Sequence, residues 1–252
     1  MTISLRAAAA IVLLAVSALP AGAQTRTLLQ ATTTVNGEPI RFPTRANIVT
    51  ATLSTLQPAG QTGFYAPSFP AVVYVLGGTL SLDVTGRPAR TVRSGETFVA
   101  PNKMAMNLAN KGSSPAKFLT VYFGEEKQAL NKSGTGEPRG LNTEAVLETT
   151  TTWMGEPILF PVGANQLSVL TSSVAPKGAI ARHTHAHTQF VFVLDGQHGV
   201  QPAGRPIHTF RAGVAMVETT QPHTGTNPGS GADRFVTVFA GKAGVPLSTP
   251  AH

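Results

Sequence analysis

Residues 178–196 read GAIARHTHAHTQFVFVLDG and combine closely spaced histidines with an apolar run that ends at a glycine. His183 and His185 are two positions apart, so on a β-strand both side chains point to the same face. Gln189 shares that parity, and residues 190–194 are rich in the aromatic and β-branched types that strands favour. The stretch therefore predicts strands that present imidazole groups to one side of a sheet.

The same frame occurs twice in the chain of 252 residues, at a nearly constant offset. The segment GEPI at 37–40 recurs at 155–158, and GRP at 86–88 recurs at 204–206, an offset of 118 residues in both cases. Beyond Gly213 the offset becomes 117, which indicates one inserted or deleted residue in a turn. Matches held in register over this distance predict two copies of one structural module.

The copies predict a first domain at 27–127, a linker at 128–143 and a second domain at 144–247. The linker is polar and rich in glycine and proline, as connectors commonly are. The chain has 25 glycines and 19 prolines and no long segment of helical periodicity, so we expect an all-β fold. The predicted strands lie within residues 71–75, 80–84, 118–123, 167–171, 190–194, 214–217 and 235–239.

Two motifs in the second copy resemble those of the cupin superfamily. The first is the spacing of glycine, HxH and glycine in residues 178–196, and the second runs from Gly213 through His223 to Asn227. The segment 244–247, GVPL after an aromatic strand, is similar to the ends of small exported cupin proteins. The resemblance implies a bicupin, that is, two tandem cupin barrels with the jelly-roll (double-stranded β-helix) fold.

By this resemblance, one divalent transition metal ion is expected in the second barrel, with the ligands His183, His185, Gln189 and His223. Neutral imidazoles suit Fe, Mn, Zn, Ni or Cu, and three of them leave coordination positions open for substrate or water. The chain has no cysteine, so thiolate ligands are excluded. Gln189 stands where cupins carry a glutamate, and its neutral amide weakens the attraction for a divalent ion.

Two other residues are candidates at this site. His187 shares the strand parity of His185 and is the alternative to Gln189 as a fourth ligand. Glu218, five residues before His223, is the candidate catalytic residue, either as a general base or as a group that orients an imidazole.

The first copy keeps the frame but not the ligands. Its residues at the positions of His183, His185, Gln189 and His223 are Tyr65, Pro67, Ala71 and Met106. We therefore expect a barrel that has lost the metal site and serves as a structural or interface module. Phe64, Tyr65 and Met106 are expected to line an apolar cavity in it.

Residues 1–23 have the pattern of a secretory signal peptide. Arg6 precedes an apolar run at 7–18, and the small residues at 21–23 predict cleavage after Ala23. The run is too short to cross a bilayer, so no stable membrane insertion is expected after cleavage. We predict a periplasmic or secreted protein.

Charge and composition limit the expected partners. The formal net charge is +7, but only 12% of the residues are charged and no dense basic cluster occurs, so no nucleic acid partner is expected. A small-molecule substrate or ligand is expected, and a homodimer is left open. His198 and His208 lie outside both motifs and are expected to be solvated, whereas Trp153 is expected to pack.

These features predict a metal-dependent periplasmic enzyme that acts on a small polar organic substrate. A fold alone does not choose a reaction, so dioxygenation stands first among candidates that include lyase and isomerase chemistry. The alternative is a non-enzymatic protein that binds a small ligand or carbohydrate, with a structural metal or none.

Overall fold

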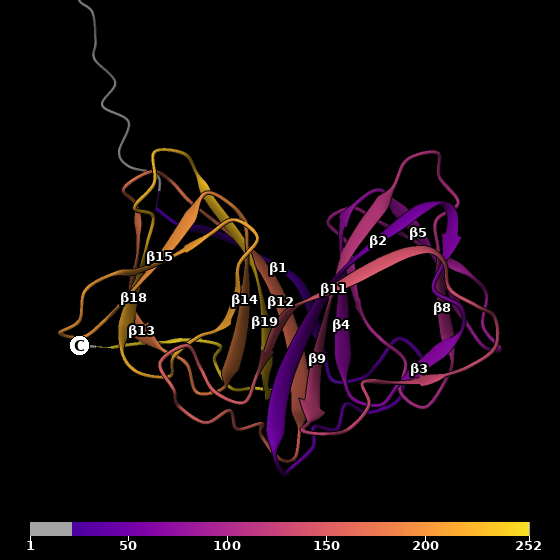
Figure 1. The fold of residues 1–252 in the computed structure, drawn as a ribbon. Helices are drawn as coiled ribbons and strands as arrows, with labels where there is room; N and C mark the ends of the chain where they lie inside the picture. The colour runs from indigo at the N-terminus through magenta and orange to yellow at the C-terminus, as the bar shows by residue number, and fades with distance from the viewer. Residues whose placement is uncertain (1–21, 252) are drawn as a thin grey trace, which may run out of the picture.

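The computed structural model describes residues 22–251, which form two β-barrels side by side (Figure 1). Nearly all of the predicted signal peptide, residues 1–21, lies outside the described part. No helix occurs in the described residues, and none therefore is long and apolar enough to cross a membrane. Each of the strands predicted from the sequence is present, and the all-β tandem of barrels is confirmed.

The first barrel is a single ten-stranded sheet that curls on itself. Its long strands pair in the order β11–β2–β9–β4, with β2 hydrogen-bonded to β9 over its first ten residues. Its strands are β2 (Asn47–Gln61), β3 (Tyr65–Pro67), β4 (Ala71–Gly77), β5 (Thr79–Val84), β6 (Arg90–Arg93), β7 (Thr97–Val99), β8 (Met106–Ala109), β9 (Ala116–Glu125), β10 (Asn131–Ser133) and β11 (Arg139–Thr149).

The second barrel consists of two five-stranded sheets, ordered β1–β12–β19–β14–β17 and β16–β15–β18–β13–β20. The chain turns tightly between β14 and β15 at Gly196, whose positive φ of 78° is matched by Gly78 at 77° in the first barrel. Its strands are β1 (Gln24–Ala31), β12 (Asn165–Val174), β13 (Ala179–Thr184), β14 (Thr188–Asp195), β15 (Gln197–Pro202), β16 (His208–Arg211), β17 (Ala215–Val217), β18 (His223–Thr226), β19 (Asp233–Lys242) and β20 (Thr249–Pro250).

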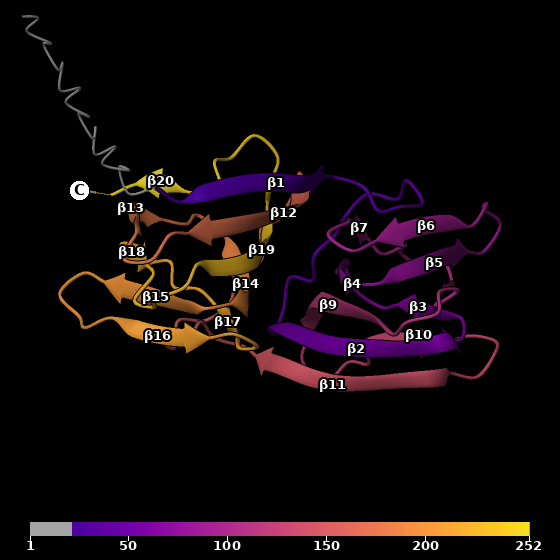
Figure 2. The same ribbon diagram turned by 90° about the horizontal axis from the view of Figure 1, so that it is seen from above.

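Each barrel is completed by a strand from the part of the chain where the other copy begins. β1 pairs with β12 of the second barrel, and β11 pairs with β2 of the first (Figure 2). The predicted linker at 128–143 therefore differs from the structure, because it contains β10 and the first residues of β11. The composition of residues 128–143 indicates a polar, exposed segment. It does not indicate that the end of this segment forms a strand that pairs with the open edge of β2.

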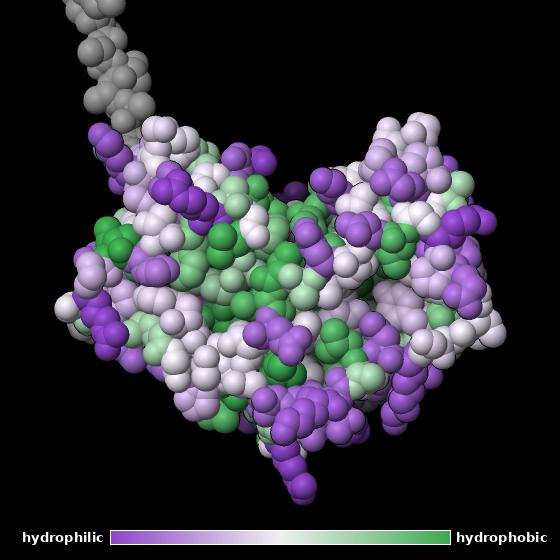
Figure 3. Space-filling model, viewed as in Figure 1, coloured by the Kyte–Doolittle hydropathy of each residue, from purple (hydrophilic) through white to green (hydrophobic). Residues whose placement is uncertain are grey.

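The barrels pack through the outer faces of their long strands. One apolar cluster draws residues from both, and at its centre Phe42, Phe123 and Phe160 have ring centroids 5.5–5.9 Å apart. Phe42 and Phe160 are equivalent in the repeat, so the interface joins like faces. Hydrophobic residues are also visible along the line where the barrels meet (Figure 3). This interface holds the two barrels as one unit, while each barrel keeps a separate interior core.

Candidate metal centre

The histidines of both predicted motifs meet inside the second barrel. His183 near the end of β13 lies opposite His223 at the start of β18 in the strand register, and His185 follows β13. Their ring centroids are 4.4–5.2 Å apart. One ring nitrogen from each lies within 4.8 Å of the others, so the three residues are positioned to bind a metal ion.

Backbone carbonyls fix the orientation of all three rings. Nδ1 of His183 lies 2.7 Å from the Ala181 oxygen, and Nδ1 of His223 lies 2.7 Å from the Gln221 oxygen. Nδ1 of His185 lies 2.8 Å from the oxygen of Leu247, in the segment before β20. A carbonyl only accepts hydrogen bonds, so each Nδ1 carries the proton and each neutral ring presents the lone pair of Nε2.

The Nε2 atoms of His183 and His185 are 3.1 Å apart. Two lone pairs at this distance repel unless a cation or a proton lies between them. Nitrogens that are bound about 2.1 Å from one ion lie about 3.0–3.4 Å apart in common geometries. The arrangement of the imidazoles therefore fits a bound metal ion.

Burial favours the neutral form of His185 and His183. His185 is 6% exposed, and His183 is partly buried. Burial lowers the pKa of His185 from 6.5 to about 4, and it also lowers the pKa of His183. A metal ligand must be deprotonated, so both shifts favour the ligand form at neutral pH.

Glu218 and Gln189 form a buried pair beside the histidines. Nε2 of Gln189 donates to one carboxylate oxygen of Glu218 at 3.2 Å, and the other oxygen lies 3.4 Å from Nε2 of His223. The Nδ1 side of His223 is already occupied by Gln221, so Glu218 does not orient this ring from behind. Of the two roles predicted for Glu218, its place on the Nε2 side of His223 favours the general base over the group that orients an imidazole.

Several buried polar atoms at this point have no hydrogen-bond partner among residues 22–251. They are Nε2 of His223, Oε1 of Glu218 and Oε1 of Gln189. Buried polar groups are rarely left unpaired, and here a nitrogen lone pair and two oxygens share one small region. All of them are electron-pair donors, which is the set of groups that a divalent cation requires.

Glu156 holds the segment that carries Glu218, and the sequence analysis missed this role. Its carboxylate accepts from the hydroxyl of Thr219 at 2.7 Å and from the hydroxyl and backbone nitrogen of Thr220. Burial alone would raise the pKa of Glu156, but these bonds and one from Thr152 lower it. The repeated GEP turn was the signal in the sequence, but its long-range partner was not visible there.

The remaining candidates lie elsewhere. His187 packs against Gly241 of β19 and is not part of the histidine cluster. His198 is 2% exposed and its Nδ1 lies 2.8 Å from Asp233, so the prediction that it is solvated is wrong. His208 is exposed, as predicted, and its ring stacks on Trp153 at a centroid distance of 5.0 Å.

Comparisons with known proteins identify the fold. No protein-family model matches the sequence, and no match was found among curated proteins. A mutant of oxalate decarboxylase from Bacillus subtilis matches with a TM-score of 0.61 and 12% identity, over 93% of this chain and 80% of that one. The coconut allergen cocosin matches at 0.55 and 11% identity, over 77% of each chain. AerE from Microcystis aeruginosa matches at 0.55 and 13% identity, over 78% of this chain and 88% of that one.

These neighbours are cupin-fold proteins. The chain has the cupin fold in both of its barrels. At identities this low, the likeness establishes the fold of the two barrels and leaves the activity of the protein to be argued from the site.

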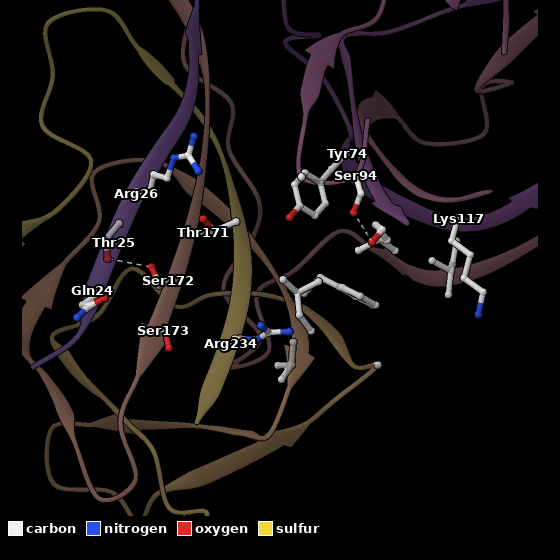
Figure 4. Close-up of a pocket in the computed structure, with 17 residues that line it drawn as sticks. Gln24, Thr25, Arg26, Tyr74, Ser94, Lys117, Thr171, Ser172, Ser173 and Arg234 are labelled. Carbon is white, nitrogen blue, oxygen red and sulfur yellow. Dashed lines mark hydrogen bonds between the residues drawn. The ribbon is translucent and has the colours of Figure 1, made fainter. Parts of the chain in front are cut away.

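A large groove of about 820 Å³ lies between the two barrels, away from the histidines (Figure 4). Arg26 and Arg234 from the second barrel and Tyr74 and Lys117 from the first line it. None of the three clustered histidines belongs to its lining. The groove is therefore separate from the candidate metal centre.

Proposed function

We propose that this bicupin is a metal-dependent enzyme of the periplasm that acts on a small polar organic substrate. The observation that carries the proposal is the convergence of the Nε2 lone pairs of His183, His185 and His223 beside Glu218. These residues would hold one divalent transition metal ion, Fe, Mn, Zn, Ni or Cu. The predicted signal peptide, with cleavage after Ala23, supports export.

A bound ion would supply Lewis acidity or redox chemistry. Around it, the protein groups have separable tasks. The carbonyls of Ala181, Gln221 and Leu247 fix the imidazoles, and Glu156 holds the segment next to Glu218. Glu218 takes or returns a proton at its free oxygen, while Gln189 donates to the other oxygen and holds the carboxylate in place.

Oxalate decarboxylase, whose structures describe Mn(II) centres, supports Mn as a candidate ion and a small carboxylic acid as a candidate substrate. Dioxygenation is the first alternative reaction, because three imidazoles leave open coordination positions. Lyase and isomerase reactions need the same open positions and the same proton carrier.

The test starts with metal content. We would strip the purified protein with a chelator, reconstitute it in turn with Fe, Mn, Zn, Cu and Ni, and count bound ions by mass spectrometry. We expect one ion per chain in the wild type and none in His223→Ala. Failure of all five ions to bind would contradict the proposal.

Activity is then measured with the loaded protein. Oxygen uptake and carbon dioxide release are followed with oxalate and with other small 2-oxo and 2-hydroxy acids. Turnover in the wild type that is absent in His223→Ala supports an enzyme. Stoichiometric metal without turnover would favour the second candidate, a non-enzymatic ligand-binding protein.

A further inference from the structure

The first barrel contains a cavity of about 350 Å³ in the interior that lacks metal ligands. It lies between β2, β9 and β3 and is covered by residues 130–138. Phe64 and Tyr65 line it as expected from the sequence, but Met106 is fully buried and does not. The volume is in the range of sites for small organic ligands, and it is well above that needed for a single benzene ring.

Hydroxyl groups line one part of this cavity. Thr52, Ser54 and Thr143 come from the neighbouring strands β2 and β11, and Thr120 comes from β9. Ser54 and Thr143 are hydrogen-bonded to each other at 2.9 Å. A hydroxyl can both donate and accept, so this wall can pair with hydroxyl or carbonyl groups of a ligand.

The hydroxyl of Tyr65 is a further polar group in the lining of this cavity. Within the described residues no hydrogen bond engages its hydroxyl, whereas the hydroxyl of Tyr122 accepts from Asn131 at 3.2 Å. Burial raises the pKa of Tyr65 well above its ordinary value, so the hydroxyl keeps its proton and remains a donor. Tyr65 is half-buried in the wall of the cavity, so its hydroxyl can donate a hydrogen bond to a bound ligand.

Aromatic rings form the other walls. Phe118 and Tyr122 project from β9, and Phe64 and Tyr65 face them from the loop and strand that follow β2. Rings of this kind bind flat molecules through edge-to-face and offset contacts. The only charged residue in the lining is Glu137, so an anionic ligand would be buried without a counter-charge.

The segment 130–138, which covers the cavity, lies close to the barrel wall. Gly134 donates its N–H to the Phe64 oxygen, and Phe64 donates to the Thr135 oxygen, both at 2.8 Å. A Cβ atom added to Gly63 would lie 2.2 Å from the oxygen of Gly136, so only glycine permits this approach. The cover is therefore a packed part of the fold that bounds the cavity.

We propose that the first barrel binds a small uncharged molecule of one or two rings, with hydroxyl groups on its edge, in this cavity and without a metal ion. The hydroxyl wall and Tyr65 pair with the edge of the ligand, and the aromatic walls pack against its faces. This site is independent of the proposed enzymatic function in the second barrel, because none of its groups belongs to the metal centre.

The test uses isothermal titration of the full chain with resorcinol in the presence of a chelator. The two hydroxyls of resorcinol are too far apart to chelate a metal, and the chelator removes any contribution from the second barrel. We expect saturable binding with one site per chain. Absence of saturable binding by resorcinol and by glucose would overturn the proposal.

The repeat offers a matched control for the location of the site. Thr120→Val removes a hydroxyl from the cavity wall with little change of shape, and we expect the affinity to fall about fivefold, as for one lost hydrogen bond. Thr237→Val makes the same change at the equivalent buried position of the second barrel, and we expect no effect there. Equal losses in both variants, or none in Thr120→Val, would overturn the assignment to this cavity.

Further binding measurements, with one more variant and two more ligands, identify the chemistry of the ligand. Tyr65→Phe is expected to weaken resorcinol binding about fivefold while leaving the fold unchanged, since only the unpartnered hydroxyl is lost. Glucose binding that is sensitive to Thr120→Val would support the proposal and point to a sugar as the source of the ring. Binding of 3,5-dihydroxybenzoate as tight as that of resorcinol would contradict an uncharged ligand.

Discussion

The two barrels place different chemistry on one backbone. His183 lies opposite His223 in the strand register of the second barrel, and Tyr65 lies opposite Met106 in the first. The first pair contributes lone pairs to a cluster of electron-pair donors, and the second contributes a phenol and a fully buried thioether. The barrel therefore sets where a residue at these positions points, and the residue type alone decides whether a metal can bind.

The asparagines Asn110 and Asn227 show what the shared frame requires. Each donates from Nδ2 to two backbone oxygens at 2.8–2.9 Å, and each accepts from a backbone N–H two residues later at 2.9 Å. The bonds are the same in the barrel with the histidine cluster and in the barrel without it. Asn227 therefore supports the turn and is not a part of the metal centre, although it belongs to the second motif.

The largest effect is expected from alanine substitutions at one pair of equivalent positions, His223 in the second barrel and Met106 in the first. His223→Ala removes a ligand, so we expect loss of stoichiometric metal, measured by mass spectrometry, with the β-rich fold intact. Met106→Ala at the equivalent position leaves a cavity in a packed core, so it should cost about 2–5 kcal/mol of unfolding free energy and leave the metal content unchanged. Full metal occupancy in His223→Ala would mean that the ligands have been assigned wrongly.

Acidification should destabilise the metal-free protein through the second barrel. The pKa of His185 is about 4 when folded, against an ordinary value of 6.5, so folding disfavours the charged form. Stability is then full above pH 6.5 and falls as the pH drops toward 4, by up to about 3 kcal/mol from this group. Denaturant unfolding in a chelator at several pH values measures the loss.

The matched variants for this prediction are His185→Asn and His208→Asn. The first removes one of the two imidazoles whose pKa is lowered by burial and should reduce the pH dependence, and the second removes an exposed histidine and should leave it unchanged. An unaltered pH profile in His185→Asn would show that the loss has another origin.

A smaller effect is expected at Glu218. Glu218→Gln keeps a partner for Gln189 but removes the negative charge next to His223, so the affinity for a divalent ion should fall about tenfold. Metal titration of the chelator-stripped protein measures this. Glu144→Gln, an exposed carboxylate on β11, is the control for a general change of charge. If both variants bind alike, Glu218 is not on the metal side.

Gln189→Glu is expected to have the smallest effect. It places a second carboxylate against Glu218, so the metal-free protein should lose about 1 kcal/mol of unfolding free energy from repulsion. A bound cation relieves this repulsion, and the metal should therefore raise the melting temperature more than it does in the wild type. The same metal-induced shift in both proteins would place Gln189 outside the influence of the ion.

Local patterns were sufficient to predict seven of the strands, the repeat and the meeting of the three histidines. Strand parity aligned His183 with His185, and the repeat fixed the register. The repeat also indicates the environment of His198. The equivalent residue in the first copy is Leu80, which is fully buried. Burial of His198 beside Asp233 was therefore predictable from its counterpart.

The strand exchange and the position of Glu218 were not predictable in this way. β11 covers the open edge of β2 in the first barrel. The periodicity of a strand contains no information on which strand it pairs with. The distance between Glu218 and His223 depends on the tether from Glu156, which is 62 residues earlier than Glu218 in the chain. Contacts of this range require coordinates.

The most direct test of the metal centre is an anomalous-scattering map from crystals of the reconstituted protein. The structure predicts one peak in the second barrel, within bonding distance of Nε2 of His183, His185 and His223, and none in the interior of the first barrel. A map without a peak at the three histidines, or with its peak in the first barrel, would contradict the account.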